Sequence, residues 1–159
     1  MKFLQKLNNL LFGASDKHIN NVVEENIIHK PIDKVSNFNK IAPELFGPRL
    51  KEYGYVFSKM ENSEDNGFLY STHHFYKNEI LNLTVDIQQA PYYTEYGFSI
   101  FLLSSEKEDS LLLCNVPHEL QDKEDNFLIR TSNKFFTNPD VITMLKGESW
   151  KIINHIRID

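Results

Sequence analysis

The clearest pattern of apolar and polar positions runs from residue 81 to residue 88. Apolar residues alternate there with polar ones: Leu81, Leu83, Val85 and Ile87 with Asn82, Thr84, Asp86 and Gln88. Such alternation is typical of a strand with one buried face. Residues 68–76 precede it and complete a predicted hairpin. A loop of two or four residues centred on Lys77–Asn78 places Leu83 opposite Thr72, whereas an odd loop would set apolar residues against polar ones.

Other short apolar segments predict strands at 55–60, 94–105, 110–116 and 127–132. The segments between them, such as 61–67 and 117–126, are rich in Glu, Asp, Ser and Asn and predict turns. Short polar links are typical of an antiparallel meander rather than of βαβ units. Residues 150–158 also alternate and favour a last strand, with a helix as the alternative.

Helical spacing of apolar residues predicts a helix over 33–53. Asp33 is suited to its N-cap, and Gly54 suits the left-handed position after it. Pro43 and Pro48 each remove a helical hydrogen bond, so a kink or a break is expected.

A later helix is predicted over 139–146, where the local signals agree. Asn138 suits the N-cap, Pro139 suits the first helical position, and Gly147 suits the residue after the end. At the N-terminus, apolar residues from Phe3 to Leu11 also repeat at helical spacing and predict a short amphipathic helix.

These elements predict an α+β domain over residues 32–159, preceded by the N-terminal amphipathic helix and a linker over 1–31. The domain is expected to hold one antiparallel sheet of about five to six strands in a meander, with helices packed on one face. The alternative is a strongly curved, cone-like sheet around a pocket. The predicted core comprises Phe38, Leu45, Leu50, Phe57, Phe68, Tyr70, Leu83, Val85, Phe98, Ile100, Leu102, Leu112, Ile142, Leu145 and Trp150.

Charge and cysteine content narrow the class of protein. The 159 residues carry a formal charge of −5, without a basic cluster for nucleic acid, so a positively charged protein partner is favoured. The single cysteine, Cys114, lies in an apolar run and is expected to be a buried hydrophobe in a reducing cytoplasm. The sequence offers no apolar run of the ~18–20 residues that span a bilayer.

Candidate chemistry centres on the adjacent His73 and His74. Neighbouring strand side chains point to opposite faces, so the two imidazoles diverge, and the sequence has no further ligand at metal-site spacing. Ser71 and Asp86 share the polar face of His73. The predicted register separates Asp86 from His73, and two strand positions put Ser71 about 7 Å away. We therefore expect no metal, no cofactor and no catalytic residue.

The segment Arg49–Leu103 resembles certain small bacterial α+β domains. In these, a helix ending Leu-x-x-x-Gly-aromatic leads into a strand, then "FY", an alternating strand ending in Gln, and an aromatic-rich strand. Several such families are immunity proteins of bacterial toxin systems. The resemblance covers about one third of the chain and includes no catalytic residue. It implies a cytoplasmic protein that neutralises a toxin.

The expected function is a non-catalytic protein-binding domain. The alternative is a small-ligand-binding or hydrolytic domain with a pocket in a curved sheet. In a meander, the turns at 61–67, 89–94 and 117–126 fall at one end of the sheet. That end gathers the predicted partner-binding residues Tyr92, Tyr93, Glu61, Glu64, Asp65, Glu119, Asp122, Glu124 and Asp125. Tyrosines beside clustered carboxylates are typical of a surface that binds a basic partner.

Overall fold

The computed structural model describes residues 34–91, 97–121 and 126–151 and the backbone of 156–157. The helices are α2 (Lys34–Glu52), α3 (His118–Gln121), α4 (Phe127–Thr137) and α5 (Pro139–Leu145). The strands are β1 (Val56–Asp65), β2 (Phe68–Asn78), β3 (Leu83–Gln89), β4 (Phe98–Ser104), β5 (Asp109–Val116) and β6 (Ile156–Arg157). The predicted N-terminal helix and linker lie outside the described residues, so the domain boundary at 31/32 stays a prediction.

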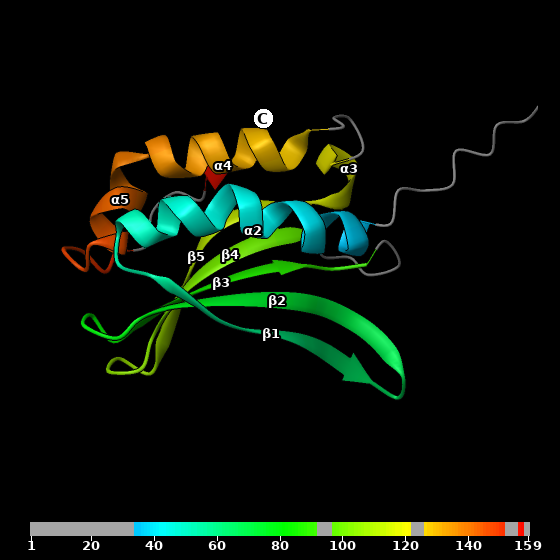
Figure 1. Ribbon diagram of the computed structural model, residues 1–159, viewed down its shortest axis with the longest axis horizontal. Helices are drawn as coiled ribbons and strands as arrows, with labels where there is room; N and C mark the ends of the chain where they lie inside the picture. The colour runs from blue at the N-terminus through cyan, green and yellow to red at the C-terminus, as the bar shows by residue number, and fades with distance from the viewer. Residues whose placement is uncertain (1–33, 92–96, 122–125, 152–155, 158–159) are drawn as a thin grey trace, which may run out of the picture. The chain divides into compact units, whose positions relative to one another are not determined.

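The strands form one open sheet in the order β1-β2-β3-β4-β5-β6. The first five are antiparallel neighbours, and α2 and α4 lie over one face of the sheet (Figure 1). This confirms the α+β meander with helices on one face, and the sheet is not curled into the cone that was the alternative. The last strand departs from a meander: β6 pairs parallel to β5, because the chain first crosses over through the helices.

The core lies between this sheet face and the helices. Eight predicted core residues are buried: Phe38, Leu50, Leu83, Val85, Phe98, Ile100, Leu102 and Leu145. Leu45, Leu112, Ile142 and Trp150 are partly buried. Phe57, Phe68 and Tyr70 were wrongly placed in the core, since each is about half exposed or more. Phe57 lies on the edge strand β1, and Phe68 and Tyr70 lie near the tip of the β1–β2 hairpin, which extends past the helices (Figure 1).

α2 is one helix through both prolines, so of the two expected outcomes, a kink or a break, the break is wrong. Its buried residues, Phe38, Ala42, Phe46 and Leu50, recur every four positions and form one stripe against the sheet. Burial of this stripe offsets the cost of the missing hydrogen bonds, which is about 3 kcal/mol for each interior proline. Gly47 also relieves the clash that a Cβ would make with the ring of Pro48.

The β1–β2 turn lies later than predicted. Residues 61–65 continue β1, and the turn is the pair Asn66 and Gly67, with φ of +50° and +80°. Positive φ at both central residues is the geometry of a two-residue hairpin turn, for which Asn-Gly is the strongest sequence signal. The predicted strand at 55–60 and turn at 61–67 were therefore wrong in extent.

The β2–β3 turn also lies later than predicted, at residues 79–82. Lys77 and Asn78 belong to β2. Leu83 pairs with Asn78, whereas the predicted register placed it opposite Thr72. The Asn78 side chain accepts hydrogen bonds from the backbone N–H groups of Ile80 and Leu81, both at 3.1 Å, which fixes the turn after it. The loop length is still even, so the predicted faces are confirmed although the register is wrong.

The segment 127–132, predicted as a strand, is the first half of α4. The buried residues of α4 follow a helical period: Phe127, Leu128, Thr131, Ser132, Phe135 and Phe136. The predicted helix at 139–146 is confirmed by α5, where Asn138 Oδ1 accepts from the backbone N–H groups of Asp140 and Val141. The predicted strand at 110–116 is confirmed by β5. β4 covers the described part of 94–105, and β6 the described strand within 150–158.

Candidate functional site

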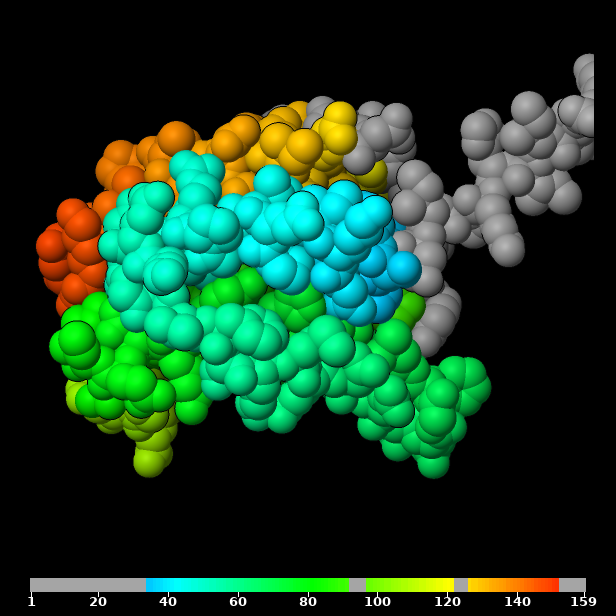
Figure 2. All heavy atoms as spheres, viewed as in Figure 1, coloured from blue at the N-terminus to red at the C-terminus, as the bar shows by residue number. Residues whose placement is uncertain are grey.

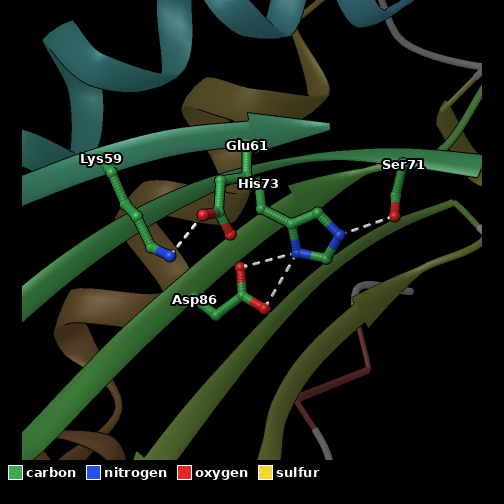
Figure 3. Close-up of polar contacts among 5 residues, drawn as sticks. All are labelled: Lys59, Glu61, Ser71, His73 and Asp86. Atoms are coloured by element: carbon green, nitrogen blue, oxygen red, sulfur yellow. Dashed lines mark hydrogen bonds and ion pairs between the residues drawn. The ribbon is translucent and has the colours of Figure 1, made fainter. Parts of the chain in front are cut away.

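Ser71, His73 and Asp86 form a chain of hydrogen bonds on the sheet face that the helices leave open (Figure 3). Ser71 Oγ lies 2.7 Å from His73 Nε2. On the other side of the imidazole, His73 Nδ1 lies 3.1 Å from both carboxylate oxygens of Asp86. The order hydroxyl, imidazole, carboxylate is that of a serine-nucleophile triad.

This cluster contradicts the expectation that the three residues lie too far apart. With the turn at 79–82, His73 faces Gln88 and Phe75 faces Asp86. The Asp86 side chain is therefore one diagonal step from His73, within reach of a hydrogen bond. The 7 Å expected between Ser71 and His73 is a spacing of their backbones, and the imidazole spans it along the strand.

Neighbouring side chains hold the His73 ring in place. The ring stacks on Phe75 with centroids 5.7 Å apart and an interplanar angle of 6°. Glu61 lies opposite His73 on β1, but it is paired with Lys59 (Figure 3). Asp86 is thus the carboxylate bonded to the imidazole, and it is buried, with 8% of its surface exposed.

His74 plays a different part, as the predicted divergence of the two histidines requires. It is buried on the helix side, where its ring stacks on Phe38 at 4.5 Å and Nε2 lies 3.0 Å from Asn39 Oδ1. An amide oxygen only accepts, so Nε2 carries the proton, and the buried Nδ1 has no hydrogen-bond partner. Desolvation by burial lowers the pKa of His74, so this histidine is a neutral core residue.

A second candidate is the apolar surface of the β1–β2 hairpin. Phe57, Met60, Phe68 and Tyr70 are 51%, 53%, 64% and 47% exposed. Figure 2 shows the end of this hairpin projecting beyond the helical layer. Large apolar side chains grouped on one exposed element are typical of a protein-interaction surface.

A hollow of about 410 Å³ lies beside the other end of the same hairpin. Its lining includes Val56, Phe57, Lys77 and Ile80. The hollow is at the edge of the sheet and not inside a curved sheet, where the alternative function would place a pocket. It extends the apolar surface of the hairpin towards the β2–β3 turn.

The predicted acidic binding end is described only in part. Glu61, Glu64 and Asp65 are exposed on β1, and Glu119 is exposed on α3. Tyr92, Tyr93, Asp122, Glu124 and Asp125 lie outside the described residues. Their grouping into one surface therefore stays a prediction.

Other predicted features concern metals, the cysteine and membranes. Over the described ranges, His, Cys, Asp and Glu do not gather in groups of three that could hold a metal ion. Cys114 is confirmed as a buried hydrophobe, and burial raises the pKa of its thiol to about 12. Within the same ranges, each helix is too short or too polar to cross a bilayer.

Comparison with known proteins gives no relative: no protein-family model, curated protein or solved structure matches the chain.

Proposed function

We propose that this chain is a protein-binding domain that takes a basic partner on the β1–β2 hairpin. The observation that carries the proposal is the exposure of Phe57, Met60, Phe68 and Tyr70 on an element that projects from the domain. Aromatic residues and methionine are enriched at protein interfaces, where they fill pockets of the partner. Two aromatic residues near the tip, Phe68 and Tyr70, are the proposed anchors.

The edge of the sheet supports the same surface. β1 is the first strand in the sheet order, and all ten of its residues are exposed. An edge strand offers backbone hydrogen bonds to an added strand of a partner. Irregular pairing at Phe57/Lys59 and at Ser63/Glu64 leaves a short regular stretch between them, which limits the added strand to about five residues.

Charge indicates which partner is suited to this edge. β1 carries Glu61, Glu64 and Asp65 against one basic residue, Lys59. A basic segment complements these carboxylates and is steered towards them. A second copy of the chain is a poor partner, because antiparallel pairing centred on Glu61 sets the two Glu61 carboxylates opposite each other.

The resemblance of Arg49–Leu103 to immunity domains indicates which kind of protein the partner would be. The partner would be a toxin with a basic surface, such as a nuclease whose active site holds phosphate, and the complex would form in the cytoplasm. Such a protein acts by covering its partner and needs no cofactor. The hairpin and the acidic end predicted from the sequence are adjoining parts of the proposed interface through Glu61, Glu64 and Asp65.

Affinity capture with matched variants tests the proposal. Full-length wild-type protein is used as bait beside Phe68→Asp, Tyr70→Asp and the control Ile129→Asp, which changes an apolar residue of α4 that is 46% exposed. A specific partner is one retained by wild type and by the control but lost by the hairpin variants. With that partner purified, each hairpin substitution is expected to weaken binding by about 2 kcal/mol or more.

Charge reversal separates the two parts of the interface. Glu64→Lys and Asp65→Lys on the hairpin, and Asp122→Lys and Glu124→Lys in the predicted acidic end, are each expected to slow association most strongly at low salt. A partner whose affinity is the same for Phe68→Asp, Tyr70→Asp and wild type would show that the hairpin is not its binding site.

A further inference from the structure

We propose that Ser71 is a nucleophile, activated by His73 and oriented through Asp86, that takes the acyl group of a neutral carboxylic ester. This activity goes beyond the proposed binding function and uses the open sheet face. The expectation of no catalysis rested on a separation of these three residues that the structure does not have.

The hydrogen-bond chain places the three groups in the arrangement that nucleophilic attack needs. With Asp86 accepting from His73 Nδ1–H, a neutral imidazole presents an unprotonated Nε2 to Ser71 Oγ, 2.7 Å away. Nε2 is then the base that receives the Ser71 proton. Stacking on Phe75 limits rotation of the imidazole, which keeps the base aimed at the hydroxyl.

The surroundings of the cluster select the substrate. Asp86 is directly beside His73, and Glu61 lies opposite on β1, so an anionic ester would meet negative charge. The nearby cation, Lys59, is engaged by Glu61 and lies over the Phe75 ring at 5.1 Å. A phosphate ester would find no cation free within this cluster, whereas a neutral ester can lie against the aromatic ring of Phe75.

The step balances with these residues and the ester alone. Ser71 Oγ attacks the carbonyl carbon while its proton moves to His73 Nε2. The bond to the leaving alkoxide then breaks, His73 returns the proton to that oxygen, and Ser71 carries the acyl group. Water, with His73 again as the base, releases the carboxylic acid and restores the hydroxyl.

The position of Ser71 within β2 determines how fast we expect ester turnover to be. Ser71 pairs with Ser63 beside the irregular pairing at Ser63/Glu64, within a strand and not at a sharp strand-to-helix turn, where backbone N–H groups would converge on a developing oxyanion. Loss of one such donor costs roughly 10²–10³ in rate. Turnover is therefore expected to be slow, and the acylated protein is the better readout.

Covalent labelling of the full chain tests the proposal. An alkyl fluorophosphonate is expected to give one adduct per chain on Ser71, with fluoride as the leaving group, located by mass spectrometry of peptides. 4-Nitrophenyl acetate is expected to give an acetyl group on the same residue. His73→Gln is expected to slow both reactions by roughly 10²–10⁴-fold, and to remove their dependence on pH, because the general base is gone.

Two further variants separate activation from folding. Ser63→Ala changes the serine opposite Ser71 and is expected to react like wild type, while Asp86→Asn is expected to slow labelling and shift its pH profile. Circular dichroism melts establish that each variant is folded. Labelling of Ser71 at an equal rate in wild type and His73→Gln, or a folded wild type that forms no Ser71 adduct, would show that the chain of hydrogen bonds is only structural.

Discussion

At the residue scale, neighbouring positions on β3 differ sharply in what they tolerate. Leu83 is 6% exposed within the core, whereas Thr84 lies half-buried on the open face, opposite Lys77. Leu83→Asp is expected to lower the free energy of unfolding by several kcal/mol, because a carboxylate is buried without a partner. Thr84→Asp is expected to change it by less than about 1 kcal/mol, since its carboxylate faces an ammonium group. Equal midpoints for the two variants in urea melts would contradict the assigned faces.

His74 gives a second prediction at this scale, concerning pH. Burial lowers the pKa of His74 in the folded state below its unfolded value of about 6.5. The unfolded chain therefore binds the proton more readily, and stability present above that pH is lost as the pH falls through it. Denaturant melts between pH 7.5 and pH 5 are expected to show this loss in wild type and in His73→Gln. His74→Gln should show a smaller loss; an unchanged loss would assign it to other groups.

At the scale of elements, the Asn66–Gly67 turn is expected to control formation of the β1–β2 hairpin. Gly67 has a φ of +80°, and a Cβ added there meets nothing within 4 Å, so substitution tests conformation rather than space. Gly67→Val is expected to cost about 1–2 kcal/mol, the strain of a left-handed L-residue. Gly67→Asn is the matched control, because Asn tolerates this region, and should cost less. Urea melts compare the two variants, and equal costs would refute the conformational account.

The two hairpin turns show how much of the fold and of the candidate site could be predicted from the sequence. Periodicity and the parity of the loop predicted the fold class and the buried face of β3, and the capping residues predicted the ends of α5, because each signal depends on residues close in sequence. The candidate site was missed because it depends on the register between β2 and β3. Asn78 sets that register: its Oδ1 accepts the backbone N–H groups of the turn that follows, and its Nδ2 donates to Tyr53 O at 2.9 Å. That second contact joins residues 25 positions apart and leaves no local pattern. By contrast, Asn66-Gly67 was a local signal that could have placed the first turn.

At the scale of the whole molecule, tertiary packing rather than local propensity determines that α2 and α4 are helical. α2 keeps two prolines because its stripe of Phe38, Ala42, Phe46 and Leu50 meets the sheet. α4 is helical although its first residues favour a strand, because Phe135 and Phe136 pack against Phe46, with ring centroids 6.3 and 5.9 Å apart. These aromatic contacts link the helical layer into one core, so global unfolding is expected to be cooperative.

Cys114 offers a direct measure of that cooperativity. It is the single cysteine of the chain, has no exposed surface, and lies in β5 between β4 and β6. Burial raises the pKa of its thiol to about 12, so iodoacetamide is expected to reach a reactive thiolate only when the core opens. Alkylation of native protein should then be at least roughly 10³-fold slower than that of urea-unfolded protein, the lower end of folding equilibrium constants for small domains.

The free energy from these alkylation rates is expected to equal that from urea melts, and Leu83→Asp should lower both values equally. Both measurements then report one transition, in which the β5 strand and the helical layer separate together. A smaller free energy from alkylation would contradict this, since it would mean that β5 and the two-residue β6 open without the rest of the core. Gly67→Val distinguishes the hairpin from the core in the same experiment. If the hairpin tip frays on its own, this variant leaves both the alkylation rate of Cys114 and the urea midpoint of the core unchanged, whereas cooperative unfolding raises the rate and lowers the midpoint.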